Sequence, residues 1–144
     1  MEKKEQVNVA VSIDIDDVLE KVYAASAWHA VGRASGYVIT PDNAAMLRST
    51  MREGFDDLRS RAGGYLAAAS YNPEADRGNI RLTFVLRHTP PALFADEVCG
   101  VIEQLLANFV LFRHYGADDG YFYAAWQKYR AQLMLMFARD NMDF

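Results

Sequence analysis

Two short segments of the chain alternate apolar and polar residues, and this pattern limits the folds that the chain can adopt. Residues 7–16 carry valine or isoleucine at every second position, and residues 80–87 repeat the pattern with isoleucine, leucine and phenylalanine. Alternation with a period of two is typical of a β-strand with one buried face. Two such strands form a sheet too small to be stable alone, so helices must cover its apolar face.

A first helix is expected directly after the first strand. Asp17 is its predicted N-cap, and Glu20 three residues later completes a pair that resembles a capping box. The helix is expected to end between Gly32 and Gly36. Its apolar side consists of Val18, Leu19, Val22, Tyr23 and Ala27.

A second helix is expected to start at the segment Thr40-Pro41-Asp42-Asn43. The threonine can cap the helix, the proline suits the first helical position, and the aspartate lies favourably at the positive end of the helix dipole. Apolar residues then recur at steps of three and four, at Leu47, Met51, Phe55, Leu58, Ala62, Tyr65 and Leu66. The pair Gly63-Gly64 predicts a kink or break within this stripe, and residues 72–79 predict a loop.

Two further helices are expected after the second strand, which ends at HTPP. Pro90 and Pro91 cannot continue a strand ladder, but they can open a helix. Gly116 is the predicted C-terminal cap of the third helix, and Asp118 or Asp119 starts the fourth. The stripe of the third helix is Leu93, Phe94, Val98, Val101, Ile102, Leu105, Phe109 and Phe112. The stripe of the fourth is Phe122, Ala125, Trp126, Tyr129, Leu133, Met136 and Phe137.

These elements predict an α+β fold that is mostly helical. Four main helices accompany a small two-stranded sheet in the order β-α-α-β-α-α. The length of 144 residues suits a single domain spanning residues 1–144, and an apolar share of 51% is enough for one core.

Charge and composition exclude several classes of partner. A net charge of −4 argues against a nucleic-acid binder, which is expected to be basic. No polybasic patch and no apolar stretch long enough to span a membrane is visible, so no membrane partner is expected. Cys99 is the only cysteine, which rules out an internal disulfide and cysteine-rich zinc motifs. The expected protein is soluble and cytoplasmic.

The segment SIDIDDVL, residues 12–19, resembles the first motif of haloacid-dehalogenase-type phosphohydrolases, in which a strand ends in Asp-x-Asp. The resemblance implies that Asp14 is a phosphate-accepting nucleophile and that Asp16 is an acid/base. It also implies a magnesium ion that screens the crowded negative charge. A magnesium-dependent phosphohydrolase is therefore one alternative function.

The chain departs from the pattern of that family in three respects. The central strands of a parallel sheet are near-continuous apolar runs, whereas residues 7–16 alternate. A doubly wound fold needs several strands between helices, and two are predicted here. Lys21 and Lys128 are the only lysines after the motif, and the acidic pair expected after such a lysine is imitated only by Asp140 and Asp143.

No catalytic, cofactor-binding or metal-ligating residue is predicted elsewhere, and no cofactor is expected. The three histidines, His29, His88 and His114, are far apart in sequence and lack the spacing of a metal-binding motif. Cys99 lies in an apolar helical pattern and is expected to be a small buried residue. A small-ligand site between the helices remains a further alternative.

Three features suggest a protein partner or self-association. Tyr121, Tyr123 and Arg130 combine aromatic and arginine side chains, which are enriched at protein interfaces. Residues 133–144 (LMLMFARDNMDF) are apolar on nearly all sides of a helix, which is typical of a helix that is buried or meets a partner. Open strand edges also invite pairing with another chain.

The order of the elements, with the strand NIRLTFVLR and an aromatic-rich last helix, resembles small uncharacterised proteins encoded by prophages of gut bacteria. The resemblance implies a non-enzymatic structural or assembly protein, such as a phage virion or tail-assembly component, that forms an oligomer. It carries no functional residues across. This structural or interaction role is the leading hypothesis, and incorporation into a virion would follow synthesis in the cytoplasm.

Overall fold

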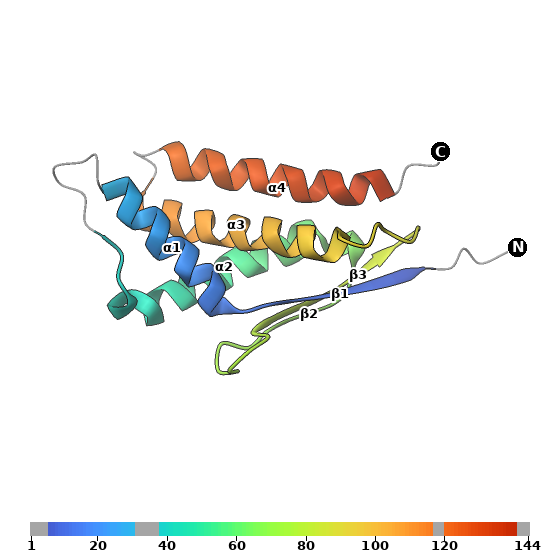
Figure 1. Ribbon diagram of the computed structural model, residues 1–144, viewed down its shortest axis with the longest axis horizontal. Coiled ribbons are helices and arrows are strands. Elements are labelled where there is room, and N and C mark those ends of the chain that lie inside the picture. Colours follow the sequence, from blue (N-terminus) through green and yellow to red (C-terminus); the bar gives the residue numbers. More distant parts are fainter. Residues whose placement is uncertain (1–5, 31–37, 117–119, 141–144) are drawn as a thin grey trace, which may run out of the picture.

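The computed structural model describes residues 6–30, 38–116 and 120–140 and confirms an α+β fold that is mostly helical. The chain runs through strand β1, helices α1 and α2, strands β2 and β3, and helices α3 and α4 (Figure 1). Their bounds are Val7–Ile13, Ile15–Ala30, Ala44–Arg61, Leu66–Tyr71, Ile80–Leu86, Phe94–Tyr115 and Gly120–Asp140. Short 3-10 helices precede α2 (η1, Pro41–Asn43) and β2 (η2, Gly63–Tyr65).

Within the residues that the structure describes, the sheet has three strands, so the predicted number of two strands is wrong by one. Helix α2 ends at Arg61, and the chain then turns through η2 into β2. Tyr65 and Leu66, which were predicted on the stripe of the second helix, therefore lie in η2 and β2. The helix breaks before Gly63-Gly64, so the break, one of the two predicted outcomes, is confirmed.

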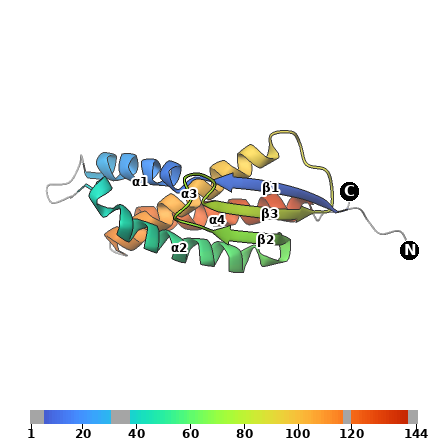
Figure 2. The same cartoon turned by 90° about the horizontal axis from the view of Figure 1, so that it is seen from below.

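All strand pairs are antiparallel, and the order is β1-β3-β2, which places β3 in the centre (Figure 2). Val11 lies opposite Leu82, and Ala69 lies opposite the same residue on the other side. Residues directly opposite one another share a face of the sheet. The predicted alternation in β1 and β3 is confirmed, because Ile80, Leu82, Phe84 and Leu86 are all buried against the helices.

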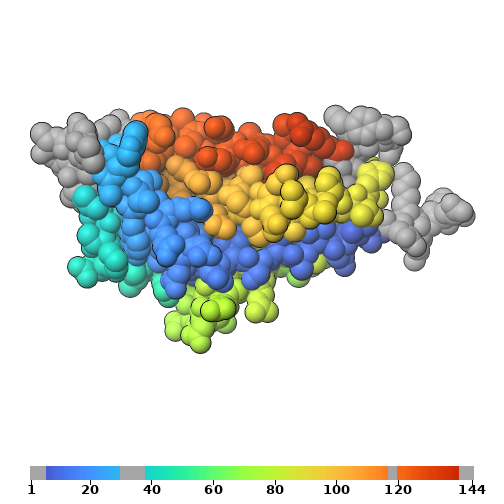
Figure 3. Space-filling view, in the orientation of Figure 1, coloured from blue at the N-terminus to red at the C-terminus, as the bar shows by residue number. Residues whose placement is uncertain are grey.

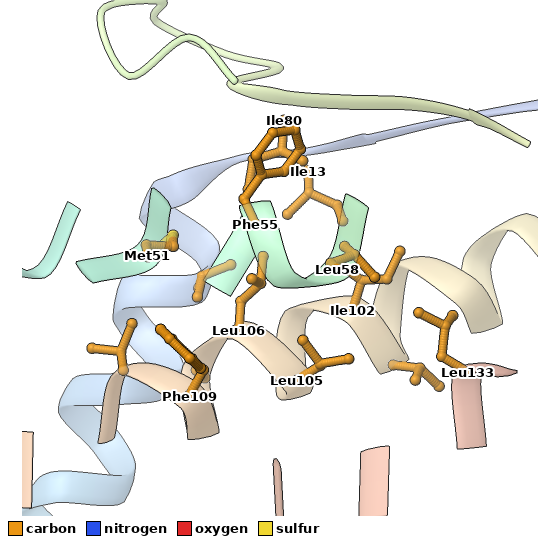
Figure 4. Packing of buried hydrophobic residues seen from close by; sticks show 14 of the residues in the cluster. Ile13, Met51, Phe55, Leu58, Ile80, Ile102, Leu105, Leu106, Phe109 and Leu133 are labelled. Carbon is orange, nitrogen blue, oxygen red and sulfur yellow. The ribbon is translucent and has the colours of Figure 1, made fainter. Parts of the chain in front are cut away.

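The helices cover only one face of the sheet (Figure 1). Helix α3 lies between the sheet and α4, and α1 and α2 flank it (Figures 1 and 2). Residues 105–111 of α3 are all buried, which requires neighbours on every side of this helix. The core residues meet around it, with Phe55, Leu58 and Ile102 between sheet and helices (Figure 4).

Helices α2 and α3 approach closely at Gly54. A Cβ atom built there would lie 2.8 Å from Cδ1 of Phe109, which is closer than carbon atoms pack. The absence of a side chain at Gly54 therefore permits this contact.

The predicted start of α1 is wrong by three residues. The backbone oxygen of Asp14 accepts hydrogen bonds from the nitrogens of Asp17 at 3.1 Å and Val18 at 3.4 Å, so Asp14 occupies the N-cap position. Asp17 lies in the first turn, where its charge still suits the helix dipole. The predicted end between residues 32 and 36 falls outside the described residues.

Other predicted boundaries agree with the structure. Thr40 precedes η1, which leads directly into α2, and residues 72–79 connect β2 and β3. Gly116 caps α3 with a positive φ of 81°, a conformation that favours glycine. The predicted start of the fourth helix at Asp118 or Asp119 lies outside the described residues.

Candidate protein-interaction surface

The two aspartates of the candidate phosphohydrolase motif have separate partners. Oδ1 of Asp14 accepts a hydrogen bond of 2.6 Å from the backbone nitrogen of Gly78 in the loop between β2 and β3. Oδ1 of Asp16 lies 3.3 Å from a guanidinium nitrogen of Arg48 on α2. Each carboxylate thus joins a different pair of elements.

Asn79 completes the connection between this loop and α1. Its Oδ1 accepts a hydrogen bond of 2.9 Å from the backbone nitrogen of Ile15. Its Nδ2 donates to the backbone oxygens of Asn72 at 3.0 Å and Ala75 at 2.7 Å. Sequence reasoning assigned Asn79 only to a loop, because its role depends on a contact between distant segments.

The surroundings of Asp14 and Asp16 differ from those that the phosphohydrolase resemblance implies. The sheet is antiparallel, whereas that family has a central parallel sheet. Within the described residues, no three histidine, cysteine, aspartate or glutamate side chains gather into a group that could hold a metal ion.

Two of the three predicted histidines, His29 and His114, lie where helices meet or end. The ring of His29 lies 4.9 Å from the rings of both Tyr115 and Phe122, where α1 meets α3 and α4. His114 is in the last turn of α3, and burial lowers the pKa of its imidazole.

The three predicted interface residues on α4 differ in exposure. Tyr121 and Tyr123 are 62% and 42% exposed. The guanidinium of Arg130 instead lies 4.5 Å from the ring centre of Trp126 and 3.7 Å from a carboxylate oxygen of Asp57 on α2. Arg130 therefore contributes to packing within the chain.

The C-terminal half of α4 is buried on one side only. Phe137 stacks on Phe84 of β3 with ring centres 4.5 Å apart, which anchors α4 to the sheet. Leu135 on the opposite side is 52% exposed and borders a groove of about 480 Å³ between α3 and α4. Helix α4 forms one long side of the molecule (Figure 3).

The small-ligand alternative would need an enclosed site with convergent polar groups. A hollow of about 150 Å³ lies between α1, α3 and α4 beside the buried Asn108. Its volume is below the range of roughly 300–1,000 Å³ that is usual for ligand pockets. The α3–α4 groove is larger, but it is open to solvent.

Among the described residues, strand β2 is an edge strand, and the backbone groups on its outer side have no partner strand. The nitrogen of Asn72 donates to the oxygen of Asn79 at 2.7 Å, so the backbone of Asn72 points toward β3. Backbone direction alternates along an antiparallel ladder. The N–H and C=O groups of Ala69 and Tyr71 therefore point away from β3, toward the free edge.

The side chains of β2 leave this edge accessible. The strand, LAAASY, contains no charged residue and no proline. A shallow groove of about 230 Å³ runs beside it and is lined by Arg59, Gly63 and residues 66–69. Arg52 stacks on Tyr71 with its guanidinium carbon 5.7 Å from the ring centre, and Arg81 lies opposite Ser70.

Strand β1 forms the other edge and is partly covered. The Cys99 thiol on α3 donates to the backbone oxygen of Ser12 at 4.0 Å. Cys99 is half-buried, which is less than predicted, and burial raises the pKa of its thiol. Because α3 reaches the end of β1 in this way, β2 is the more accessible edge.

Comparisons of the chain with protein-family models, with curated proteins and with solved structures each found no significant match. In the described part of the chain, no helix combines the length and the apolar character needed to cross a bilayer.

Proposed function

We propose that this chain is a non-enzymatic structural or assembly protein that acts by binding other protein chains. The observation that carries the proposal is the free edge of β2, where Ala69 and Tyr71 present backbone donors and acceptors. An edge strand of this kind is a template for an added strand.

The lack of protection on β2 supports this role. Proteins usually guard exposed edges with lysine, proline, an inward-pointing charge or a bulge. Strand β2 has only the irregularity between Leu66 and Ala68, where its register to β3 shifts. The stretch from Ala68 to Tyr71 pairs regularly with β3 and leaves its outer edge unguarded.

The contacts of the acidic motif also favour a structural role. Asp14 and Asp16 bind the β2–β3 loop and α2, and Asn79 adds three hydrogen bonds at the same place. These contacts stabilise the junction between the β2–β3 hairpin and the helices α1 and α2.

The resemblance to prophage-encoded proteins supplies a specific context, a phage virion or tail-assembly component that forms an oligomer. The genes beside the coding sequence test this context, and a run of capsid and tail genes is expected. Neighbouring genes for an unrelated metabolic pathway would contradict it.

Co-expression tests the general function. The chain is expressed alone and with each product of its neighbouring genes, and the purified species are analysed by size-exclusion chromatography with light scattering. A defined oligomer or a stable complex with one of these products is expected. A strict monomer at high concentration that forms no complex with any of them would refute the proposal.

A further inference from the structure

We infer that the groove between β2 and α2 receives an extended acidic peptide segment of another protein, which adds to the sheet as a fourth strand. This inference rests on the proposed function and names the class of its partner. The juxtaposition that carries it is an uncharged edge strand bordered by arginines.

The backbone geometry fixes how the segment binds. Ala69 and Tyr71 each direct one N–H and one C=O toward the free edge. On an added strand, every second residue can form hydrogen bonds with these groups. An extended peptide therefore forms a ladder of hydrogen bonds with this pair. Such main-chain bonds give affinity with little dependence on sequence.

The groove leaves room for the peptide's side chains. Ala67, Ala68 and Ala69 have methyl side chains only, and a Cβ atom built on Gly63 would meet nothing within 4 Å. Side chains on one face of the added strand thus lie in the hollow of about 230 Å³ beside these residues. Valine and threonine, which favour strands, suit those positions.

Charge sets the preference for an acidic segment. Among the described contacts, Arg59 lines the groove and Arg52 stacks on Tyr71 of β2, in a chain of net charge −4. Arg59 is well exposed, and its own partner Asp56 is 3.8 Å away at the surface, a weak pair. A carboxylate on the peptide can therefore bind Arg59 at little cost.

A second copy of the chain is the competing occupant. If β2 of a second copy paired with β2 of the first, the α2 helix of the second copy would lie beside the groove. Arg52 and Arg59 of both copies would then be close together. Like charges in contact oppose association. A single extended segment avoids this repulsion.

Selection from a phage-displayed library of random peptides tests the inference on the full chain. Binders enriched in aspartate or glutamate and in β-branched residues are expected, without proline in their centre. One enriched sequence is then synthesised, and its affinity is measured by fluorescence anisotropy.

Two proline variants locate the binding edge. Ala69→Pro removes an N–H that points to the free edge, and it removes no hydrogen bond to β3. The sheet is therefore retained, because edge strands tolerate proline at such positions. Ala10→Pro is the matched control, since Ala10 lies on β1 with its backbone directed away from β3. Ala69→Pro is expected to weaken peptide binding by a factor of ten or more, roughly the loss of one or two main-chain hydrogen bonds, and Ala10→Pro to leave it unchanged.

Two charge variants test the role of the arginines. Arg59→Glu is expected to weaken the acidic peptide roughly tenfold at low salt, with a smaller effect at high salt because exposed charges are screened. Arg61→Glu makes the same charge change on a residue whose partner is Asp57, and it is expected to have little effect.

Binders whose affinity survives Ala69→Pro, or a selection that yields no binder, would overturn the inference. Self-association that Ala69→Pro abolishes would do so too, because the occupant would then be a second copy. The proposed function survives each of these results if co-expression yields a complex or an oligomer, so the two failures can be told apart.

Discussion

The side-chain oxygen of Asn79 and the backbone nitrogen of Ile15 form a buried hydrogen bond of 2.9 Å between residues 64 positions apart. The bond satisfies the first free N–H of α1, and the same amide group holds the loop between β2 and β3 through its nitrogen. One side chain thus links the start of a helix to a hairpin loop.

Asn79→Ala is expected to destabilise the fold by at least about 2 kcal/mol, because the buried N–H of Ile15 loses its acceptor and two carbonyls lose a donor. Urea unfolding followed by circular dichroism measures the change. Asn79→Asp keeps the acceptor but loses both donors, so its expected cost is also substantial. A loss below about 0.5 kcal/mol for Asn79→Ala, the range of ordinary surface changes, would show that the hydrogen bonds contribute little.

Asp14→Ala is expected to cost more stability than Asp17→Ala, which reverses the order that the predicted helix cap implied. Asp14 loses a charge-assisted hydrogen bond to Gly78, worth about 1.5–3 kcal/mol. Asp17 loses only a favourable position at the helix terminus, worth about 0.3–1 kcal/mol. Thermal denaturation of both variants measures the difference, and equal losses would contradict the assigned cap.

Ser26→Ala is expected to destabilise the protein by about 1–3 kcal/mol, although alanine favours helices. The buried Ser26 hydroxyl accepts a hydrogen bond of 2.7 Å from the nitrogen of Ile39 and lies 2.5 Å from the Tyr115 hydroxyl. Calorimetry gives the change in free energy. The control is Ser49→Ala at an exposed position of α2, where no loss is expected.

Glu103→Gln is expected to raise stability at neutral pH and to have little effect in acid. Burial raises the pKa of Glu103, assisted by the charges of Asp17 and Asp14, although Lys21 3.8 Å away opposes the shift. The folded state therefore holds the proton more tightly than the unfolded state, whose pKa is about 4.3. The stabilisation that the protonated Glu103 carboxyl contributes is fully present below the pKa of the unfolded state. It is lost as the pH rises through the higher pKa of the folded state.

Urea unfolding of wild type and Glu103→Gln across the acid and neutral range measures this difference. The gap between the two proteins should open with rising pH. A variant that is less stable than wild type at neutral pH would show that the ion pair with Lys21 outweighs the cost of burial.

The sequence predicted β1 and β3 correctly because large apolar residues stand at every second position of both strands. It did not predict β2, since Ala67, Ala68 and Ala69 fill both faces of that strand with the same side chain. Alanine favours helices, and the irregularity between Leu66 and Ala68 also breaks the period. Pairing with β3 determines the conformation here, and that contact cannot be read from local residues.

The candidate surface was predictable only in outline. The exposure of Tyr121 and Tyr123 was predictable from their positions on α4. Arg130 was predicted at the same interface, but it lies against Trp126 and Asp57, and the contact with Asp57 joins helices distant in sequence. An earlier signal for the hairpin was present in Tyr71, followed by the loop NPEADRGN and the alternating strand. Hairpin loops usually span about two to five residues, and residues 72–79 form a longer connection, so this signal alone does not identify β2.

The position of α3 determines the order in which the chain can become compact during synthesis. Strand β1 and helices α1 and α2 pack on α3, which the ribosome makes after them. Synthesis proceeds at about 5–20 residues per second, so β1 and the first two helices keep their apolar faces in water until α3 has been made. We expect the nascent protein to depend on chaperones during this interval, because its unguarded strand is then also exposed.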